Sequence, residues 1–277
     1  MPVIALTQGM GSLAQDIAEQ LADELKLSTL QHEVAERVAD KMHVSKSLIS
    51  RLRSGKAGLI EGLRADRQSM AVYTAEEVLD AAARGNVVIR GWGATQLLRP
   101  VPHVPCIRIM RPLPQRVQWL MQQLETDDAE MAEAEIRRSD SANATRMHQQ
   151  FGVDWGDPVL FDLVLNTDRL SVDTCVQQIK GLLQRPEFAE TEASRSLLQA
   201  MALHARVRAA LRAHEATSEV DITIAGSGST VVLQGIVLHA SERDAAAEVT
   251  ATVPGVGSVD NQLRVMATSR LFTSSKV

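Results

Sequence analysis

The stretch "IALTQGMGSLAQDIAEQLADEL" (residues 4–25) joins an apolar run, a short glycine turn and an amphipathic segment. Residues 3–7 read as a buried strand, and Leu13, Ile17 and Leu21 recur at the spacing of one helix face. A strand, a glycine turn and a helix in this order begin many phosphate-binding sites, because the turn points backbone N–H groups at the anion. The sequence therefore predicts a site of this shape at the start of the chain.

The rest of the first half of the chain alternates strands with helices. Apolar runs at residues 86–91, 103–110 and 158–167 predict three further buried strands. Helical patterns cover residues 32–42, 45–53, 75–83, a stretch starting near 114, and then 127–150 and 171–183. This alternation predicts an α/β domain over residues 1–185, with a parallel sheet covered by helices on both faces.

A second, smaller domain is expected at residues 195–277, after an acidic linker with a proline at residues 186–194. A helix at residues 197–214 precedes two half-buried strands, which the turn "GSGS" joins as a hairpin. A short helix at residues 242–251 and a last strand at residues 263–267 complete an α+β domain. Gly235 lies where the second strand needs a close bend.

Composition narrows the classes of protein to consider. The 277 residues are 45% hydrophobic and carry a net charge of -5, which fits a globular protein and argues against a general nucleic-acid binder. No signal-like start and no long apolar run is present, so we expect a cytoplasmic protein without membrane attachment. Cys106 and Cys175 lie far apart within apolar patterns, which favours buried free thiols over a disulfide or a metal site.

Residues 3–183 resemble the cytidylate kinase-like family of P-loop nucleotide kinases. The resemblance rests on the opening segment and on "HEVAERVADKMHVS", "NVVIRGWGA", "HVPCIRIMRPLPQRV" and "FGVDWGDPVLFDLVLNTDRLSVD". It implies a P-loop nucleotide-kinase-like parallel sheet flanked by helices. It also implies ATP, magnesium and a pyrimidine monophosphate as the ligands.

When the family's site residues are compared with this sequence position by position, only some of them are present. Gly11 and Ser12 match its phosphate loop, and Asp140 matches its lid. The departures are Leu13, Ala14 and Gln15 in place of Gly, Gly and Arg, Gln31 in place of Asp, and Trp92 and Asn143 in place of Arg. The candidate nucleotide-binding residues are Gly9, Gly11, Ser12, Arg111, Arg116, Asp140 and Arg146.

Phosphoryl transfer depends on positioning and charge neutralisation, so the lost cations and carboxylate should affect its transition state most. We therefore expect a catalytically impaired, pseudokinase-like domain and assign no catalytic residue, no metal ligand and no cofactor, with ATP and magnesium as the candidates. The alternative is an active CMP-type kinase with rearranged phosphate ligands, for which Arg90 beside Trp92 offers one replacement cation. Taken alone, Arg111 and Arg116 are more typical of surface salt bridges than of a residual anion site.

Residues 34–58 also read as a helix–turn–helix whose second helix carries Lys46, Arg51 and Arg53. The kinase-family resemblance already accounts for this helix pair. Three acidic residues, Glu33, Glu36 and Asp40, also dilute its positive charge. We therefore expect no nucleic-acid partner.

Residues 197–266 resemble a BON domain, carried by the hairpin, the glycine after "LQ", the helix and the ending "GVGSVDNQLRV". The resemblance implies a binding module, here for an unidentified protein or small ligand. Its nearly balanced charge argues against binding anionic lipid. For the whole chain we expect a regulatory, sensing or assembly protein that binds nucleotide weakly and forms a homo-oligomer.

Overall fold

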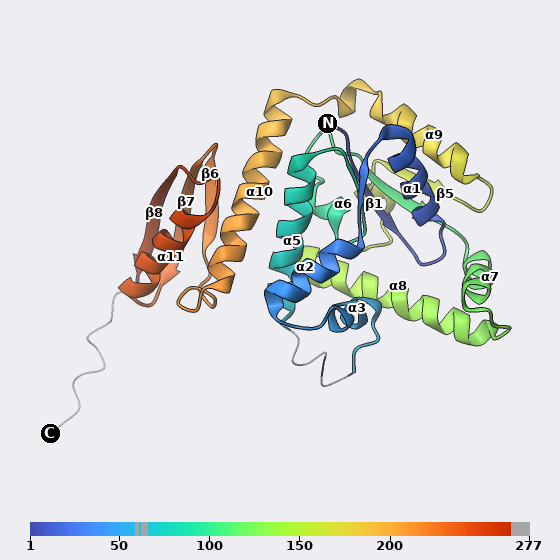
Figure 1. The fold of residues 1–277 in the computed structure, drawn as a ribbon, viewed down its shortest axis with the longest axis horizontal. Helices are drawn as coiled ribbons and strands as arrows, with labels where there is room; N and C mark the ends of the chain where they lie inside the picture. Colours follow the sequence, from blue (N-terminus) through green and yellow to red (C-terminus); the bar gives the residue numbers. More distant parts are fainter. Residues whose placement is uncertain (59–60, 62–65, 267–277) are drawn as a thin grey trace. The chain divides into compact units, whose positions relative to one another are not determined.

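The computed structural model describes residues 1–58, 61 and 66–266, and it divides the chain into two compact units, Met1–Leu198 and Gln199–Val277 (Figure 1). The boundary falls inside helix α10 (Glu192–Ala213), so one continuous helix contributes residues to both units. The segment expected to be a linker holds the one-turn helix η2 (Pro186–Phe188) and the first residues of α10.

A five-stranded parallel sheet forms the centre of the first unit, in the order β2-β3-β1-β4-β5. The predicted α/β class is confirmed. Strand β1 lies in the middle, so the glycine turn that follows it opens at the centre of the sheet's carboxyl edge. The strands are β1 (Val3–Gln8), β2 (Ser28–Leu30), β3 (Val87–Arg90), β4 (Cys106–Met110) and β5 (Leu163–Asn166).

Helices cover both faces of this sheet, as the alternation predicts (Figure 1). None of the helices in the described part of the chain has the length and apolar character needed to cross a bilayer. The helices of the first unit are α1 (Ala14–Leu25), α2 (His32–Met42), α3 (Lys46–Ser54), α5 (Arg67–Arg84), α6 (Ala94–Leu97), α7 (Leu113–Leu124), α8 (Ala129–Phe151) and α9 (Val172–Leu183).

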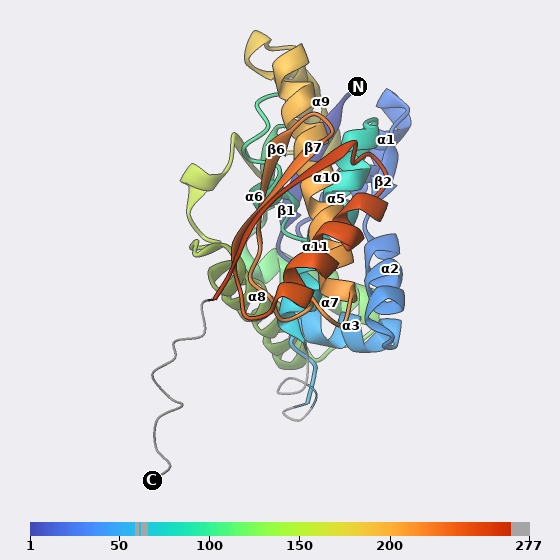
Figure 2. The same cartoon turned by 90° about the vertical axis from the view of Figure 1, so that its left-hand side faces the viewer.

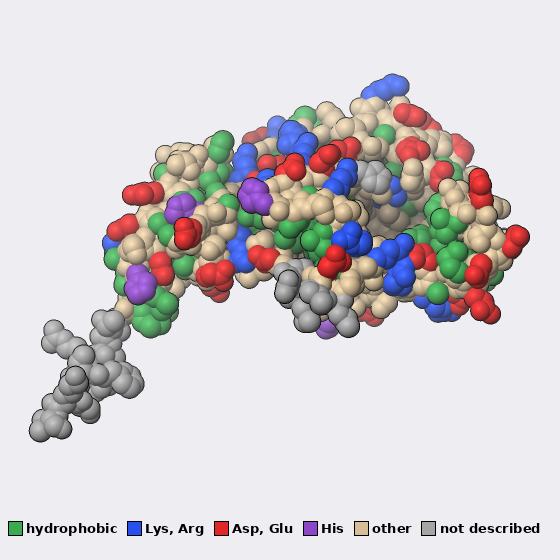
Figure 3. Space-filling model, turned by 60° about the horizontal axis from the view of Figure 1, so that its bottom comes forward, with side chains coloured by type: hydrophobic (Ala, Val, Ile, Leu, Met, Phe, Trp, Pro, Cys, Tyr) green, Lys and Arg blue, Asp and Glu red, His purple; other side chains and the backbone are tan. Residues whose placement is uncertain are grey.

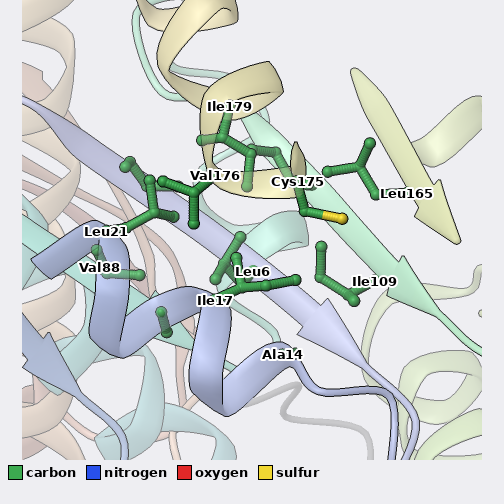
Figure 4. Close-up of a cluster of buried hydrophobic side chains, with 13 residues drawn as sticks. Leu6, Ala14, Ile17, Leu21, Val88, Ile109, Leu165, Cys175, Val176 and Ile179 are labelled. Carbon is green, nitrogen blue, oxygen red and sulfur yellow. The ribbon is translucent and has the colours of Figure 1, made fainter. Parts of the chain in front are cut away.

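The main core fills the space between one face of the sheet and helices α1 and α9 (Figure 4). Leu6 of β1 meets Ile17 and Leu21 of α1, and all three side chains are fully buried. Alternate residues of a strand share a face, so the next residue along points to the opposite layer. Cys175 lies in this core and Cys106 in the opposite layer, where its thiol reaches the backbone of α6, and both are buried free thiols as expected.

One expected element differs in the structure, and one strand was not expected. Residues 158–167 do not form one strand: Pro158–Leu160 is a single 3-10 turn, because the Asp157 carboxylate accepts a hydrogen bond from Val159 N at 2.9 Å and caps it. Only Leu163–Asn166 pairs with β4. The sequence also gave no sign of β2, whose three residues are too short to show a period.

The second unit contains the end of α10, strands β6 (Thr223–Ser227), β7 (Thr230–Val237) and β8 (Ser258–Val265), and helix α11 (Ala240–Thr252) (Figure 2). β6 and β7 form the predicted hairpin, and β8 pairs parallel to β7. The last strand thus begins five residues before the predicted start at 263, because it pairs along the whole of β7; residue 267 lies outside the described residues. Gly235 has a φ of +143°, and an added Cβ would lie 2.8 Å from the Asp221 carbonyl oxygen, so the expected close approach is present.

Candidate ligand-binding site

Residues 9–13 form the glycine turn between β1 and α1. Gly11 has a φ of +78°, and Leu13, at the N-cap of α1, has a φ of +62° and makes no side-chain cap. The Ser12 carbonyl accepts a hydrogen bond from Thr167 Oγ1 at 2.9 Å, while the buried Ser12 Oγ has no partner. The turn therefore has the shape of a phosphate-binding loop, and the Ser12 hydroxyl in it makes no hydrogen bond to a described residue.

The helix pair α7–α8 packs directly onto this turn. Met10 lies against the small core between the two helices. An added Cβ on Gly11 would lie 3.1 Å from the Trp119 ring and 3.2 Å from the backbone of Arg116. These contacts show that the turn packs closely against α7.

Arg116 provides the positive charge nearest to the turn, and that charge is already matched. Its Nη1 and Nη2 each donate to the Asp140 carboxylate at 2.8 Å, and its Nε donates to the Met10 carbonyl at 2.6 Å. An added Cβ on Gly9 would lie 2.8 Å from Nη2, which shows how closely the guanidinium covers the turn. A bidentate pair of this kind is among the stronger hydrogen-bonded ion pairs. A phosphate at the turn would have to displace Asp140.

The structure brings five of the seven predicted site residues around one small cavity of about 40 Å³. The cavity has room for water but not for a phosphate chain. The Nε of Arg111 is buried there without a partner. The five residues are Gly9, Ser12, Arg111, Arg116 and Asp140.

A larger cleft of about 390 Å³ opens on the other side of the turn, and Gly11 lines it. Its far wall carries Lys46 and Arg53 of α3 together with Arg90 at the end of β3. An inner cavity of about 660 Å³ between α3, α5 and α8 shares Arg53 and Trp92 with this cleft. In the space-filling view of the face that carries α3 and α8, Lys and Arg side chains gather around a hollow (Figure 3).

A stack of Arg53 on Trp92 forms the wall between the cleft and the inner cavity. The Arg53 guanidinium carbon lies 3.3 Å from the centroid of the indole ring. The indole Nε1 donates to the Gln31 carbonyl at 2.6 Å. Trp92 has a φ of +61°, between Gly91 at +81° and Gly93 at +72°, a conformation that costs a non-glycine residue about 1–2 kcal/mol. The surrounding contacts therefore hold the ring in a strained position under the guanidinium.

The arginines of the cleft and the inner cavity have no ion-pair partner in the described part of the chain, although Asp16 and Glu19 lie close enough to Arg90 to act on its charge. Among the described residues, no carboxylate lies within ion-pair distance of Arg53, Arg90 or Arg146. Burial, and then the charges of Arg146 and Arg90, lower the pKa of Arg53 to about 9. Burial also lowers the pKa of Arg90 and of Arg146. At neutral pH all three remain charged, since a guanidinium begins from a very high pKa. A bound anion would relieve this repulsion.

Arg146, a predicted phosphate ligand, lies at the inner cavity and not at the glycine turn. Its Nη1 and Nη2 donate to the Arg53 carbonyl at 3.3 and 3.2 Å, and Nη2 also donates to Asn143 Oδ1 at 2.6 Å. It therefore caps the last turn of α3 and positions Arg53.

Sequence reasoning missed Arg53 as a site residue. Arg53 lies at the end of α3, where Gly55 is the C-cap with a φ of +72°. The available signal was Trp92 at a position where the resemblance implies an arginine, because an aromatic ring there can hold a cation supplied from elsewhere.

The residues around the turn do not fit a magnesium ion, which prefers carboxylate and phosphate oxygens. Asp140 is held by Arg116, Gln31 has no charge, and Asp16 is the remaining carboxylate among the described residues that line the cleft. Ser12 Oγ, at the turn itself, has no described hydrogen-bond partner. In the described part of the chain, no group of three or more His, Cys, Asp or Glu could hold a metal ion.

Comparisons with known proteins agree with this architecture. The model of the cytidylate kinase-like family matches residues 3–169, and that of the BON domain matches residues 201–267. Among curated proteins, none matches the sequence. An uncharacterized protein from Eubacterium ventriosum has a similar structure, with 18% identity, a TM-score of 0.53, and coverage of 67% of this chain and 100% of its own.

Two shikimate kinases give weaker structural matches. The enzyme from Bacteroides thetaiotaomicron is 15% identical, with a TM-score of 0.41 over 66% of this chain and 99% of its own. The enzyme from Acinetobacter baumannii, solved in complex with shikimate, is 14% identical, with a TM-score of 0.40 over 66% and 93%. The family match covers more than half of the chain and coincides with the five-stranded unit. The chain therefore belongs to the cytidylate kinase-like family and carries a C-terminal BON domain.

Proposed function

We propose that the kinase-like unit binds a small anionic ligand without transferring a phosphoryl group, and that it acts with the BON domain as a sensing or regulatory protein. One observation carries this proposal: the charges of the site are divided between its two sides. Arg116, at the glycine turn, is neutralised by Asp140, whereas Arg53 and Arg90 across the cleft have no carboxylate partner among the described residues.

Transfer is disfavoured because the transferred group needs cations around it as charge develops. At the turn the cation expected from the family is replaced by Gln15, and Arg116 is committed to Asp140 and to Met10. Trp119 and the backbone of Arg116 also pack against Gly11. The family's cation at the turn is therefore missing and Arg116 is already used, which leaves Arg111, whose Nε has no described partner, and Arg90 as cations near the turn.

Binding is favoured because cations that line a concave, poorly solvated site concentrate positive potential there. Arg90 reaches across the cleft, where its Nη2 lies 3.4 Å from Gln15 Oε1 at the first turn of α1. Arg53 is held flat on Trp92. Together they make an anion site that the protein's own carboxylates leave unfilled.

The regulatory role rests on the attachment of a binding module to a unit of this kind. The match to the BON domain supports a binding module for a protein or a small ligand, and α10 contributes residues to both units. We propose a protein or small-molecule partner at the BON domain and a homo-oligomeric assembly. Size-exclusion chromatography with light scattering tests the assembly directly, and a monomeric mass at micromolar concentration would contradict it.

The binding claim is tested by isothermal titration with CMP and with ATP, each with magnesium. We expect CMP to bind, and Arg53→Gln to weaken it at least tenfold, because hydrogen bonds to a charged group contribute about 1.5–3 kcal/mol. Arg137→Gln is the matched control, since Arg137 is an exposed arginine of α8 paired with Glu133. A folded protein that binds neither these nucleotides nor the smaller organic anions tested below would overturn the binding claim, and release of ADP would overturn the claim of no transfer.

A further inference from the structure

We propose that the inner cavity selects an organic anion with an uncharged, apolar body, a phosphomonoester or carboxylate on an aromatic or aliphatic frame, in preference to a nucleotide. This inference rests on the anion binding proposed above, because Arg53 lines both the cleft and the inner cavity. The inference adds the chemical nature of the uncharged body that carries the anionic group.

The size and lining of the cavity fit such a body. At about 660 Å³ it lies in the range of pockets for small organic molecules. Sulfur, aliphatic and aromatic groups from α3, α5, α8 and the turn after β3 dominate its walls. These apolar residues are Leu52, Met70, Ala71, Trp92, Ala142 and Met147.

All charge on the described lining is positive. Arg53, Arg67 and Arg146 line the cavity, and none of its described lining residues is Asp or Glu. The partners found for Arg67 and Arg146 are neutral: Arg67 Nη1 donates to Gln149 Oε1 at 3.1 Å, and Arg146 donates to a backbone carbonyl and an amide. Arg67 is exposed, whereas Arg53 and Arg146 are largely removed from solvent without a counter-charge from the described residues, which is unfavourable, so the cavity is suited to receive an oxyanion.

The same lining is poorly suited to a nucleoside. A cytosine amino group and ribose hydroxyls are donors that need acceptors when they are buried. The described lining offers no carboxylate. Its neutral side-chain acceptors are the amides of Gln68, Gln149 and Gln150 and the hydroxyls of Thr74 and Thr145, and Gln149 Oε1 already accepts from Arg67. An apolar ring against Met70 and Met147 leaves no donor without a partner.

Isothermal titration with four probes tests the inference: 1-naphthyl phosphate, 1-naphthoate, inorganic phosphate and CMP. We expect at least one naphthyl probe to bind ten times more tightly than both inorganic phosphate and CMP. Whether the phosphate or the carboxylate probe binds more tightly identifies the head group. Arg67→Gln should weaken binding of the naphthyl probe at least fivefold, because Arg67 lines the inner cavity and not the cleft. Arg137→Gln should leave this affinity unchanged.

The outcomes separate the two proposals. Naphthyl probes that bind no better than CMP, or that Arg67→Gln does not affect, overturn the inference. If CMP binding is then still sensitive to Arg53→Gln, anion binding at the cleft stands. No binding of any of the four probes to folded protein overturns both. Circular dichroism and thermal melting of each variant confirm that a lost signal is not a loss of folding.

Discussion

The state of one side chain, Arg116, decides what the glycine turn can do. The family's pattern suggested it as a phosphate ligand, and its position against Gly9 agrees with that role. Its three hydrogen bonds, two of them to Asp140, direct its donors toward the protein itself. The turn is therefore closed by an internal ion pair, and its shape alone does not make it a phosphate site.

Asp140→Asn should open this pair and raise the affinity of the turn for an anion. The change removes the competing charge, so we expect pyrophosphate to bind at least fivefold more tightly to the variant by titration calorimetry. We also expect a loss of about 1–3 kcal/mol in the free energy of unfolding, from the weaker bonds to Arg116. Asp23→Asn, an exposed change of the same charge on α1, is the control. Unchanged pyrophosphate affinity in the folded variant would show that Asp140 does not block the turn.

Gly11→Ala should destabilise the kinase-like unit by more than backbone strain alone. Gly11 and Gly152 have similar positive φ values, +78° and +68°, but only Gly11 has neighbours within contact distance of an added Cβ, at 3.1 Å from Trp119. Strain costs about 1–2 kcal/mol at either position. Urea unfolding should show a larger loss for Gly11→Ala than for Gly152→Ala. Equal losses would mean that α7 does not press on the turn.

The sequence located the residues of the small cavity but not their state. Gly9, Ser12, Arg116 and Asp140 were candidates from the glycine turn and the family resemblance, and they do lie together. That Arg116 is neutralised depends on how α7 and α8 pack on the turn, which no local pattern encodes. Arg53 was missed for the same reason, since its role needs Trp92 from a segment about forty residues away.

At the scale of elements, ion pairs fasten α2 to α5 beside the site. Glu77 is nearly buried and accepts hydrogen bonds from Arg37 at 2.9 Å and Lys41 at 2.8 Å. Lys41 also bonds Glu76 at 2.6 Å. Burial alone would raise the pKa of Glu77, but the hydrogen bonds from Lys41 and Arg37 outweigh it and hold that pKa below its ordinary value.

Stability should therefore fall in acid in a way that depends on Glu77. A carboxyl group whose pKa is lowered by folding stabilises the protein above its unfolded pKa of 4.5, and this contribution is lost as the pH falls through the folded pKa. We expect Glu77→Gln to destabilise the protein by about 1–3 kcal/mol at pH 7 and by less below pH 4.5. Urea unfolding at both pH values tests this. Glu36→Gln, in an exposed pair with Lys46 at 3.6 Å, should cost under about 0.5 kcal/mol. A Glu77→Gln effect that does not change with pH would contradict the assignment.

Elements long enough to show a repeating apolar pattern were predicted well, whereas elements of three residues were not. The spacing of Ile17 and Leu21 in α1 and the apolar run of β3 need no tertiary information. Strand β2 is stabilised by pairing with β3, and the 3-10 turn at Pro158 by the Asp157 cap. The basic residues of α3 that suggested a helix–turn–helix serve the unit itself: Arg51 pairs with Glu61 at 2.6 Å and Arg53 stacks on Trp92.

At the scale of the whole molecule, α10 supplies a part of each unit. Its first residues belong to the kinase-like unit, where Ser194 Oγ lies 2.8 Å from His103 Nδ1. Its later residues, including Leu203 and Val207, lie in the core of the second unit. The two-unit division followed from composition and turns, but the continuity of this helix across the boundary did not.

A fragment of residues 190–277 should therefore fold alone, because it retains the whole helix and every buried residue of the second core. We expect helical circular dichroism and one cooperative urea transition. Val207→Ala, at a fully buried position, should lower its midpoint. A fragment without a cooperative transition would mean that the second unit depends on the first.

The central claim is that the kinase-like unit binds an anion and does not transfer a phosphoryl group. A coupled ADP-release assay on the full chain, with saturating magnesium-ATP and CMP and on a sample whose CMP binding has been measured by calorimetry, tests it most directly. The account predicts CMP binding that depends on Arg53 and no ADP release above a blank without CMP. ADP release that requires CMP would contradict it and would show that the turn transfers phosphate despite the Arg116–Asp140 pair.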